Sequence, residues 1–197
     1  MLIAGMDEAG RGSLISRVYV AICVLPEDFM EICQENKVII RDSKKMSKRQ
    51  RDRARLFIEQ YAIDYNVQYR EHDYIDKVGI GKATMDAMHS CVDHLQLPID
   101  RLLVDGNYYD NHRYDIFSQS VVRGDDIHPE IACASILAKT YRDEYMTNLV
   151  DTFPHILTRY GISSNMGYGT KIHMDAIEKY GFSPFHRKSF CKRNFLF

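Results

Sequence analysis

The stretch Gly5-Met6-Asp7-Glu8-Ala9-Gly10-Arg11-Gly12-Ser13 decides how the chain is interpreted, because it joins an apolar run to a charged, glycine-rich turn. The adjacent carboxylates Asp7 and Glu8 stand at the end of this predicted strand. Mg²⁺ takes oxygen ligands and is usually held by one or two carboxylates together with phosphates and water. We therefore consider Asp7 and Glu8 candidate ligands of a divalent cation.

The turn after these acids has the composition of a phosphate-binding segment. Gly10 and Gly12 would let backbone amides approach a ligand closely, since neither carries a Cβ atom. Arg11 offers a planar, forked donor for phosphate. A strand followed by a tight turn with solvated charges remains the alternative for these residues taken alone.

The composition indicates one soluble domain over residues 1–197. The chain has 45% apolar and 27% charged residues, enough for a core of its own. Its five cysteines are odd in number and form no C-x-x-C pair, which favours reduced thiols in a cytoplasmic location over disulfides or zinc. No basic leader and no apolar run of 18 residues occur, so we expect neither a signal peptide nor a membrane span.

Positive charge is concentrated in two segments although the net charge is −1. Residues 41–55 contain eight Lys or Arg and two Asp, and residues 186–197 contain four Lys or Arg and no acid. Basic patches on an acidic body can place polyanion contacts beside a carboxylate site. The solvated face of a helix is the alternative interpretation of residues 41–55.

Hydrophobic periodicity predicts an alternation of strands and helices without internal repeats. Ser47 is a predicted N-cap, Pro129 suits a first helical turn, and Gly181 ends the last helix. Small residues in the longest helix would let it pack close to a sheet. The predicted strands cover 2–7, 17–25, 63–69, 101–104 and 115–122, the predicted helices cover 47–61, 73–78, 80–95, 129–150 and 171–180, and residues 154–165 are a predicted loop.

Two further acids follow predicted strands in the same way as Asp7. Asp105 follows the apolar run Arg101 to Val104, and Asp125 follows the strand predicted over 115–122. A strand followed by Asp-Gly is also a common turn signal, so neither acid is decisive alone.

Seven short motifs span nearly the whole chain. They are GMDEAGRG (5–12), DSKKMS (42–47), VDGN (104–107), RGDD (123–126), PEIACASILAKTYRD (129–143), GYGT (167–170) with a histidine downstream at 173, and HRKSF (186–190). In this order and spacing they resemble the motifs of the type 2 ribonuclease H family, ribonuclease HII. The chain departs from the family pattern at Ser13 and Gly169, where proline is usual, at Met46 for leucine and at Arg123 for lysine. Gly169 would loosen the loop that carries Tyr168.

The resemblance implies an active site of four carboxylates that hold two Mg²⁺ or Mn²⁺ ions. They map to Asp7, Glu8, Asp105 and Asp125, and Asp125 is chosen over Asp126 because it directly follows the glycine of the motif. In such a site one ion activates the attacking water and the other stabilises the leaving 3′-oxygen.

The resemblance also implies which residues contact the substrate. Gly10, Arg11, Gly12 and Tyr168 match the family's recognition of the ribose 2′-hydroxyl, the group that distinguishes RNA from DNA. A second set of expected contacts, with phosphates or neighbouring nucleotides, comprises Ser43, Lys44, Lys45, Asn107, Lys139, Arg142 and His186.

The implied fold is α/β and ribonuclease H-like: a central mixed sheet flanked by helices, with a short helical C-terminal tail over about residues 171–197. The implied activity is hydrolysis on the 5′ side of ribonucleotides in RNA–DNA hybrids and of single ribonucleotides in duplex DNA, giving 3′-hydroxyl and 5′-phosphate ends, with roles in ribonucleotide and RNA primer removal. We expect a monomer whose partners are these nucleic acids and no membrane.

Three alternatives remain from the sequence. A ribonuclease HIII-like enzyme would prefer hybrid tracts and typically has a GTG-like turn where this chain has Arg11. A catalytically weak hybrid-binding protein would be expected to lose an acid, whereas all four are present. A metal-independent site built on histidines such as His128 and His186 lacks a paired nucleophile.

Overall fold

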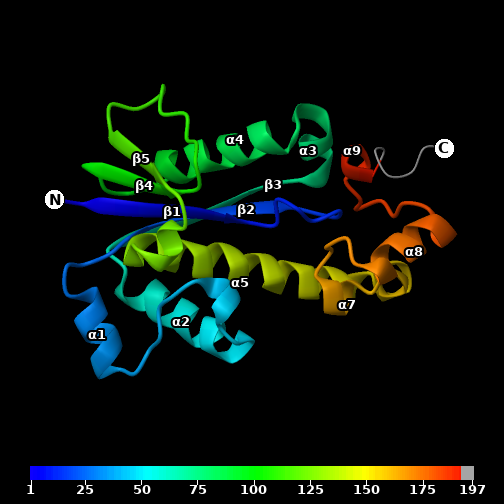
Figure 1. The fold of residues 1–197 in the computed structure, drawn as a ribbon, viewed down its shortest axis with the longest axis horizontal. Coiled ribbons are helices and arrows are strands. Elements are labelled where there is room, and N and C mark those ends of the chain that lie inside the picture. Colours follow the sequence, from blue (N-terminus) through cyan, green and yellow to red (C-terminus); the bar gives the residue numbers. More distant parts are fainter. Residues whose placement is uncertain (192–197) are drawn as a thin grey trace.

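Strand β1 (Ile3–Ala9) is the middle strand of the sheet in the computed structural model, which describes residues 1–191 (Figure 1). The strand order is β3-β2-β1-β4-β5, with β2 at Val18–Val24, β3 at Asp64–Arg70, β4 at Arg101–Asp105 and β5 at Phe117–Val121. The pairs β1–β2 and β2–β3 are antiparallel, and the pairs β1–β4 and β4–β5 are parallel. The predicted mixed sheet is confirmed.

Helices cover both faces of the sheet (Figure 1). On one face lie α3 (His72–Val78) and α4 (Ile80–Asp93); on the other lie α5 (Pro129–Thr152), α2 (Lys48–Tyr61) and α1 (Phe29–Glu35). The far end of α5 carries the C-terminal elements α6 (Pro154–Leu157), α7 (Ile162–Asn165), α8 (Lys171–Tyr180) and α9 (Lys188–Cys191). Three short 3₁₀ helices are η1 (Ser43–Lys45), η2 (Gly124–Asp126) and η3 (Thr158–Tyr160).

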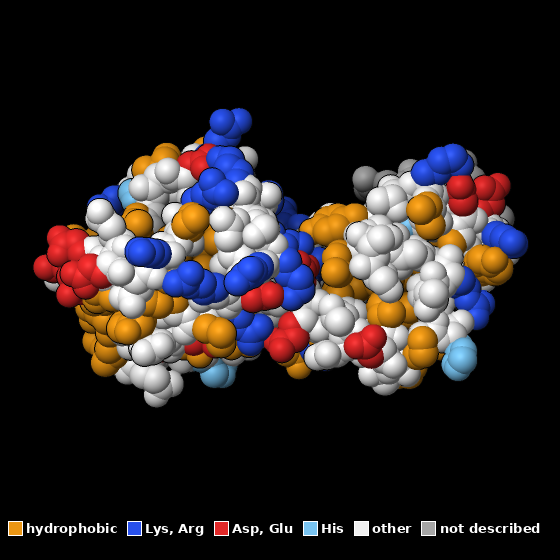
Figure 2. Space-filling view, turned by 90° about the horizontal axis from the view of Figure 1, so that it is seen from below, with side chains coloured by type: hydrophobic (Ala, Val, Ile, Leu, Met, Phe, Trp, Pro, Cys, Tyr) orange, Lys and Arg blue, Asp and Glu red, His pale blue; other side chains and the backbone are white. Residues whose placement is uncertain are grey.

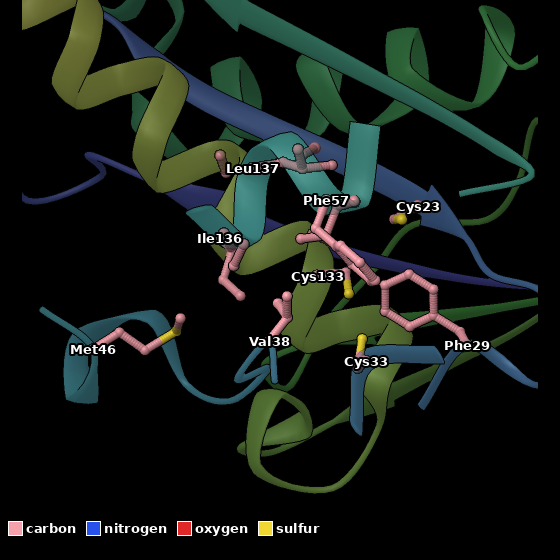
Figure 3. Packing of buried hydrophobic residues seen from close by; sticks show 14 of the residues in the cluster. Cys23, Phe29, Cys33, Val38, Met46, Phe57, Cys133, Ile136 and Leu137 are labelled. Atoms are coloured by element: carbon pink, nitrogen blue, oxygen red, sulfur yellow. The ribbon is translucent and has the colours of Figure 1, made fainter. Parts of the chain in front are cut away.

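Helix α5 is the central element of its layer, because all its residues from 131 to 138 are buried. Its N-terminal end approaches β1 so closely that a Cβ on Gly5 would lie 2.1 Å from the backbone carbon of Glu130. The small residues of α5 therefore do bring it close to the sheet, as predicted. Figure 3 shows the core between α5, α2 and α1, where Phe57 and Phe29 face the thiol of Cys133.

Strand register brings the acids to one end of the sheet. Met6 pairs with Val104, so the next residues of the two parallel strands are Asp7 and Asp105. Alternation along a strand places Asp7 on the same face as Gly5, toward α5, and Glu8 on the other face.

Among the described residues, no helix combines the length and apolarity that crossing a membrane requires.

The predicted elements agree with the structure within a few residues, with two exceptions. Ser47 caps α2 as predicted, and it does so through a capping box in which its hydroxyl accepts from the amide of Gln50. The prediction of an irregular loop over 154–165 was wrong, because α6, η3 and α7 occupy it. Helix α1 was not predicted; it has only seven residues and no side-chain cap at Asp28. The expected helical tail is only partly helical within residues 171–191, and residues 192–197 lie outside the described part.

Candidate active site

Three of the four predicted carboxylates, Asp7, Asp105 and Asp125, come from one edge of the sheet. Asp7 lies two residues before the end of β1, beside Asp105 at the end of the parallel strand β4, and the amide of Gly124 donates to Oδ1 of Asp105 at 2.8 Å. This bond holds η2 against β4, so Asp125 follows directly beside the other two. The neighbouring acid Asp126 turns outward and lies 2.5 Å from the ammonium of Lys45.

Asp7, Glu8 and Asp125 each lie within electrostatic reach of Asp105. Burial raises the pKa of Asp7 to about 8, the charge of Glu8 adds to this effect, and a hydrogen bond from Ser135 opposes it. Burial also raises the pKa of Glu8, against the opposing charge of Arg11 3.4 Å away. Burial and then the charge of Asp105 raise the pKa of Asp125. Crowded, desolvated carboxylates favour a cation at this site.

The donor chemistry of this site fits a hard divalent cation. All four groups are carboxylates, the oxygen ligands that Mg²⁺ and Mn²⁺ prefer. Within residues 1–191, no three His, Cys, Asp or Glu side chains converge into a ready-formed ligand group. The fit therefore rests on the chemistry of the four carboxylates and on their mutual repulsion.

A cleft of about 440 Å³ runs beside the acids. Burial works against the charge of Lys44, but the carboxylates of Asp7 and Asp125 outweigh it and raise the Lys44 pKa. Figure 2 shows Lys and Arg side chains gathered over α2, beside a hollow in the surface toward α7 and α8. Seven predicted substrate residues line the cleft, together with Glu8, Ala9 and Ser135: Gly10, Arg11, Gly12, Ser43, Lys44, Lys139 and Tyr168.

The other predicted contacts lie elsewhere. Lys45 is held by Asp126 and Asp42, and Asn107 lines a separate groove that also includes Arg11. Within the cleft, Lys139 is paired with Asp143 at 2.8 Å. The structure therefore brings together the glycine turn, Lys44 and Tyr168, whereas Lys45 and Asn107 flank them.

Arg142 is fully buried, which contradicts the expectation that it contacts the substrate directly. Its Nη2 donates to the carbonyl of Met166 at 2.6 Å, and its guanidinium lies 5.0 Å from the ring centroid of Tyr168. A Cβ on Gly10 would come within 2.3 Å of its Nε, and Gly10 has φ +92°. Arg142 thus positions both the glycine turn and the Tyr168 loop from beneath.

His186 is also buried, so the expectation that it approaches the nucleic acid does not hold in this structure. Its Nδ1 accepts from the amide of Ser183 at 2.8 Å, and its Nε2 lies 3.0 Å from Nε2 of His173. The Nδ1 of His173 lies 3.1 Å from the carbonyl of Tyr168. One pair of neutral tautomers satisfies every bond: His186 donates from Nε2, and His173 donates from Nδ1 to Tyr168.

Arg187, next to His186, was not singled out in the sequence and proves to be the main support of the glycine turn. It is fully buried, and burial followed by the charge of Arg142 lowers its pKa to about 9, so it remains cationic at neutral pH. Its guanidinium donates at 2.7–3.0 Å to the carbonyls of Gly10, Arg11, Ser13, Ser16 and Arg17. The HRKSF motif was the available signal, but its spacing does not say which basic residue turns inward.

Hydroxyl groups connect the loops around the cleft. Ser13, at a position usually proline in the family that the sequence resembles, donates to the carbonyl of Ile15 at 2.9 Å and lies 3.1 Å from that of Gly167. Ser43 and Ser135 share a hydrogen bond of 3.0 Å, which ties η1 to α5 beside Asp7. Ser135 was likewise missed as a site residue, since the sequence suggested only its small size.

Comparison with known proteins agrees with this geometry. The family model for ribonuclease HII matches residues 4–193. The chain belongs to the ribonuclease HII family. It is 42% identical to ribonuclease HII of Parabacteroides distasonis over 95% of this chain and 88% of that protein. It is 40% identical to ribonuclease HII of Neisseria meningitidis serogroup B over 100% of this chain and 96% of that protein. As a member of this family it is a type 2 ribonuclease H, an endonuclease of RNA–DNA hybrids, and the family depends on divalent metal.

Solved structures share the fold at lower identity. Ribonuclease H2 from Pyrococcus horikoshii superposes with a TM-score of 0.78 at 22% identity, covering 96% of this chain and 93% of that one. Bst ribonuclease HIII, solved in complex with Mn²⁺, gives a TM-score of 0.68 at 14% identity, covering 96% of this chain and 64% of that one. The ribonuclease H-like fold predicted from the sequence is thereby confirmed.

Proposed function

We propose that the enzyme hydrolyses the phosphodiester on the 5′ side of ribonucleotides, both in RNA–DNA hybrids and at single ribonucleotides embedded in duplex DNA. The products would carry 3′-hydroxyl and 5′-phosphate ends, as ribonucleotide and RNA primer removal require. The observation that carries the proposal is the placement of Asp7 and Asp105 on adjacent parallel strands, beside the glycine turn and Tyr168. The proposed state is a monomer, and its four buried free thiols support a reducing, cytoplasmic location.

The proposed ligands of two Mg²⁺ or Mn²⁺ ions are Asp7, Glu8, Asp105 and Asp125. When bound, the ions would activate the attacking water and stabilise the leaving 3′-oxygen. The raised pKa values of Asp7, Glu8 and Asp125 support this assignment, because carboxylates that are buried and also repel one another are stabilised in their charged form by a cation. The Mn²⁺ complex of Bst ribonuclease HIII is consistent with such ions.

Recognition of the 2′-hydroxyl is assigned to the backbone of Gly10 to Gly12 together with Tyr168. Tyr168 pairs with Ser13 in an isolated antiparallel bridge, so the backbone that carries the Tyr168 ring is fixed to the end of the glycine turn. The ring is 38% exposed and lines the cleft, where a ribose can reach it. A deoxyribose has no 2′-hydroxyl for the glycine turn and Tyr168 to bind, which gives the proposed discrimination between RNA and DNA a physical basis.

Phosphate contacts are assigned to Lys44 and Lys139 in the cleft, with the basic face of α2 extending them. Arg51 supports this arrangement because its Nη1 donates to the carbonyls of Ser43 and Met46 and so fixes the loop that carries Lys44. Such contacts position a duplex without reading its sequence.

The test is cleavage mapping on two substrates in Mg²⁺: a DNA duplex with one ribonucleotide, and a hybrid with an all-RNA tract. We expect one cut at the 5′ side of the single ribonucleotide, with end-group analysis giving 3′-hydroxyl and 5′-phosphate. Cleavage of the hybrid alone would assign the enzyme a ribonuclease HIII-like specificity. Binding of both substrates without cleavage in Mg²⁺ or Mn²⁺ would leave a hybrid-binding protein and contradict the proposal.

A further inference from the structure

A second groove, of about 570 Å³, opens on the α4 side of the sheet, away from Lys44 and Tyr168. Its walls are the first half of α4 and the loop after β4, and Met85 and Met88 contribute apolar surface. Arg11 lines both this groove and the active-site cleft, so the two are continuous around the glycine turn. Apart from Arg11 and Asn107, the residues that line the groove have no role in the proposed cleavage reaction.

The groove combines cations with an exposed aromatic ring. Lys82 and Arg113 line it, and their ion pairs are long, 3.4 Å from Lys82 to Asp86 and 3.3 Å from Arg113 to Asp93. Tyr108 is 68% exposed on the opposite wall. Proteins usually bind single-stranded nucleic acid by combining cationic side chains, which contact the phosphates, with an aromatic ring on which a base stacks.

The carboxylates of the groove do not cancel this attraction, because they are outnumbered. Three cationic side chains line the groove, Arg11, Lys82 and Arg113, against the two carboxylates Asp86 and Asp110. Asp86 accepts from the hydroxyl of Tyr74 at 2.7 Å, and Asp110 lies 2.7 Å from Nδ1 of His112, so both carboxylates are held against the protein.

Thr84 gives an independent indication of a ligand. It lines the groove, is only 4% exposed, and its Oγ1 has no hydrogen-bond partner among the described residues. A buried hydroxyl without a partner costs free energy that a bound polar group would recover. Because the hydroxyl can both donate and accept, it suits the edge of a base or a sugar hydroxyl.

We propose that this groove binds one or two unpaired nucleotides of a substrate strand that continues past the cut, with a base stacked on Tyr108 and phosphates near Lys82 and Arg113. The inference rests on the proposed function and extends it to a substrate class: duplexes with an unpaired arm next to the ribonucleotide. Continuity with the cleft through Arg11 favours a strand segment over a free nucleotide.

The experiment compares three DNA duplexes that contain the same single ribonucleotide. One is fully paired, and the other two leave the ribonucleotide-bearing strand unpaired from the second neighbouring nucleotide onward, on the 5′ side in one and on the 3′ side in the other. Affinity is measured by fluorescence anisotropy in EDTA, where the strand stays intact. Cleavage of the paired duplex in Mg²⁺ is measured separately, so that loss of the proposed function is distinguishable from failure of this inference.

We expect one of the unpaired arms to raise affinity about tenfold over the paired duplex, as stacking of one base provides. Tyr108→Ala should abolish that gain without changing affinity for the paired duplex, whereas Tyr180→Ala, at an exposed tyrosine of α8, should keep it. Thr84→Val should reduce the gain, and Arg113→Ala should lower the salt slope for the armed substrate by about 1.

Equal affinity for all three duplexes would overturn the inference, as would a Tyr108→Ala variant that retains the gain or weakens every duplex equally. Competition by a free ribonucleotide without any gain from an arm would assign the groove to a small nucleotide and would also overturn it.

Discussion

Replacing Arg187 with lysine should destabilise the protein more than its distance from the carboxylates suggests. The guanidinium donates to five backbone carbonyls in a fully buried position, and lysine, a point charge with three donors, can satisfy at most three of them. Each buried carbonyl left without a partner costs about 1–3 kcal/mol. We therefore expect the free energy of unfolding to fall by about 3–5 kcal/mol, within the range for disrupted buried charge networks.

This loss corresponds to a fall in Tm of about 6–20 °C for a chain of this length. Chemical denaturation and calorimetry would measure it, with Arg159→Lys as the matched control, since Arg159 is exposed and donates to the carbonyl of His155. That control should stay within about 0.5 kcal/mol of wild type. The folded Arg187→Lys variant should also show a lower kcat/KM, because Gly10 and Arg11 lose their support. A change in unfolding free energy below about 1 kcal/mol would refute the reasoning.

Three further predictions concern the loops and their buried groups. Gly10→Ala should lower kcat/KM by about tenfold to a hundredfold, because the new Cβ would displace the turn. The control is Gly79→Ala: Gly79 has a similar positive φ but open space around it, so this variant should lose about 1 kcal/mol of stability and no activity. Equal activity in both variants would contradict this prediction. Gly169→Pro should stabilise the protein by about 0.4–1 kcal/mol in urea denaturation. The amide of Thr170 donates to the carbonyl of Tyr168 at 2.8 Å, and the φ of Gly169 lies outside the left-handed region, which together indicate an inverse γ-turn that proline fits. A destabilised variant would exclude that turn. Burial lowers the pKa of His186 to about 4, so the stability that its neutral ring contributes is present above the unfolded pKa of about 6.5 and is lost as the pH falls toward 4. Between pH 6.5 and 5 the wild type should therefore lose about 1.5 kcal/mol more unfolding free energy than His186→Gln. Parallel pH profiles of Tm for the two proteins would show that His186 does not titrate as described.

The sequence predicted the sheet and the position of the acids well because both depend on local patterns. The apolar runs before Asp7 and Asp105 mark two strands, and the parallel pairing of β1 with β4 places the two acids side by side. The start of the basic helix was predicted correctly because Ser47 is a favoured N-cap residue, and the structure adds a capping box with Gln50. Where such a local signal was absent, as in α1 and in residues 154–165, the prediction failed.

The supports of the site could not be predicted, because they depend on which polar side chains fold inward. Arg142, His186 and Arg187 have the composition of a nucleic-acid surface, yet all three are buried: the two arginines bind backbone carbonyls, and His186 binds His173. Their partners are 13 to 177 positions away in sequence, a distance that no local pattern spans. The resemblance to ribonuclease HII located these residues without distinguishing substrate contacts from positioning residues.

The most direct test of the central claim is the single-turnover rate of incision at one ribonucleotide in duplex DNA, measured for wild type and Asp105→Asn in Mg²⁺ and in EDTA. The variant keeps the shape of the side chain and the acceptor for the Gly124 amide while removing one charge from the carboxylate cluster. We expect wild type to cut on the 5′ side only with Mg²⁺, and the variant to bind the duplex normally but to cut at least about a thousandfold more slowly, a loss of about 4 kcal/mol of transition-state stabilisation. An Asp105→Asn enzyme that cuts at the wild-type rate, or wild-type cleavage that persists in EDTA, would contradict the carboxylate-based, metal-dependent mechanism.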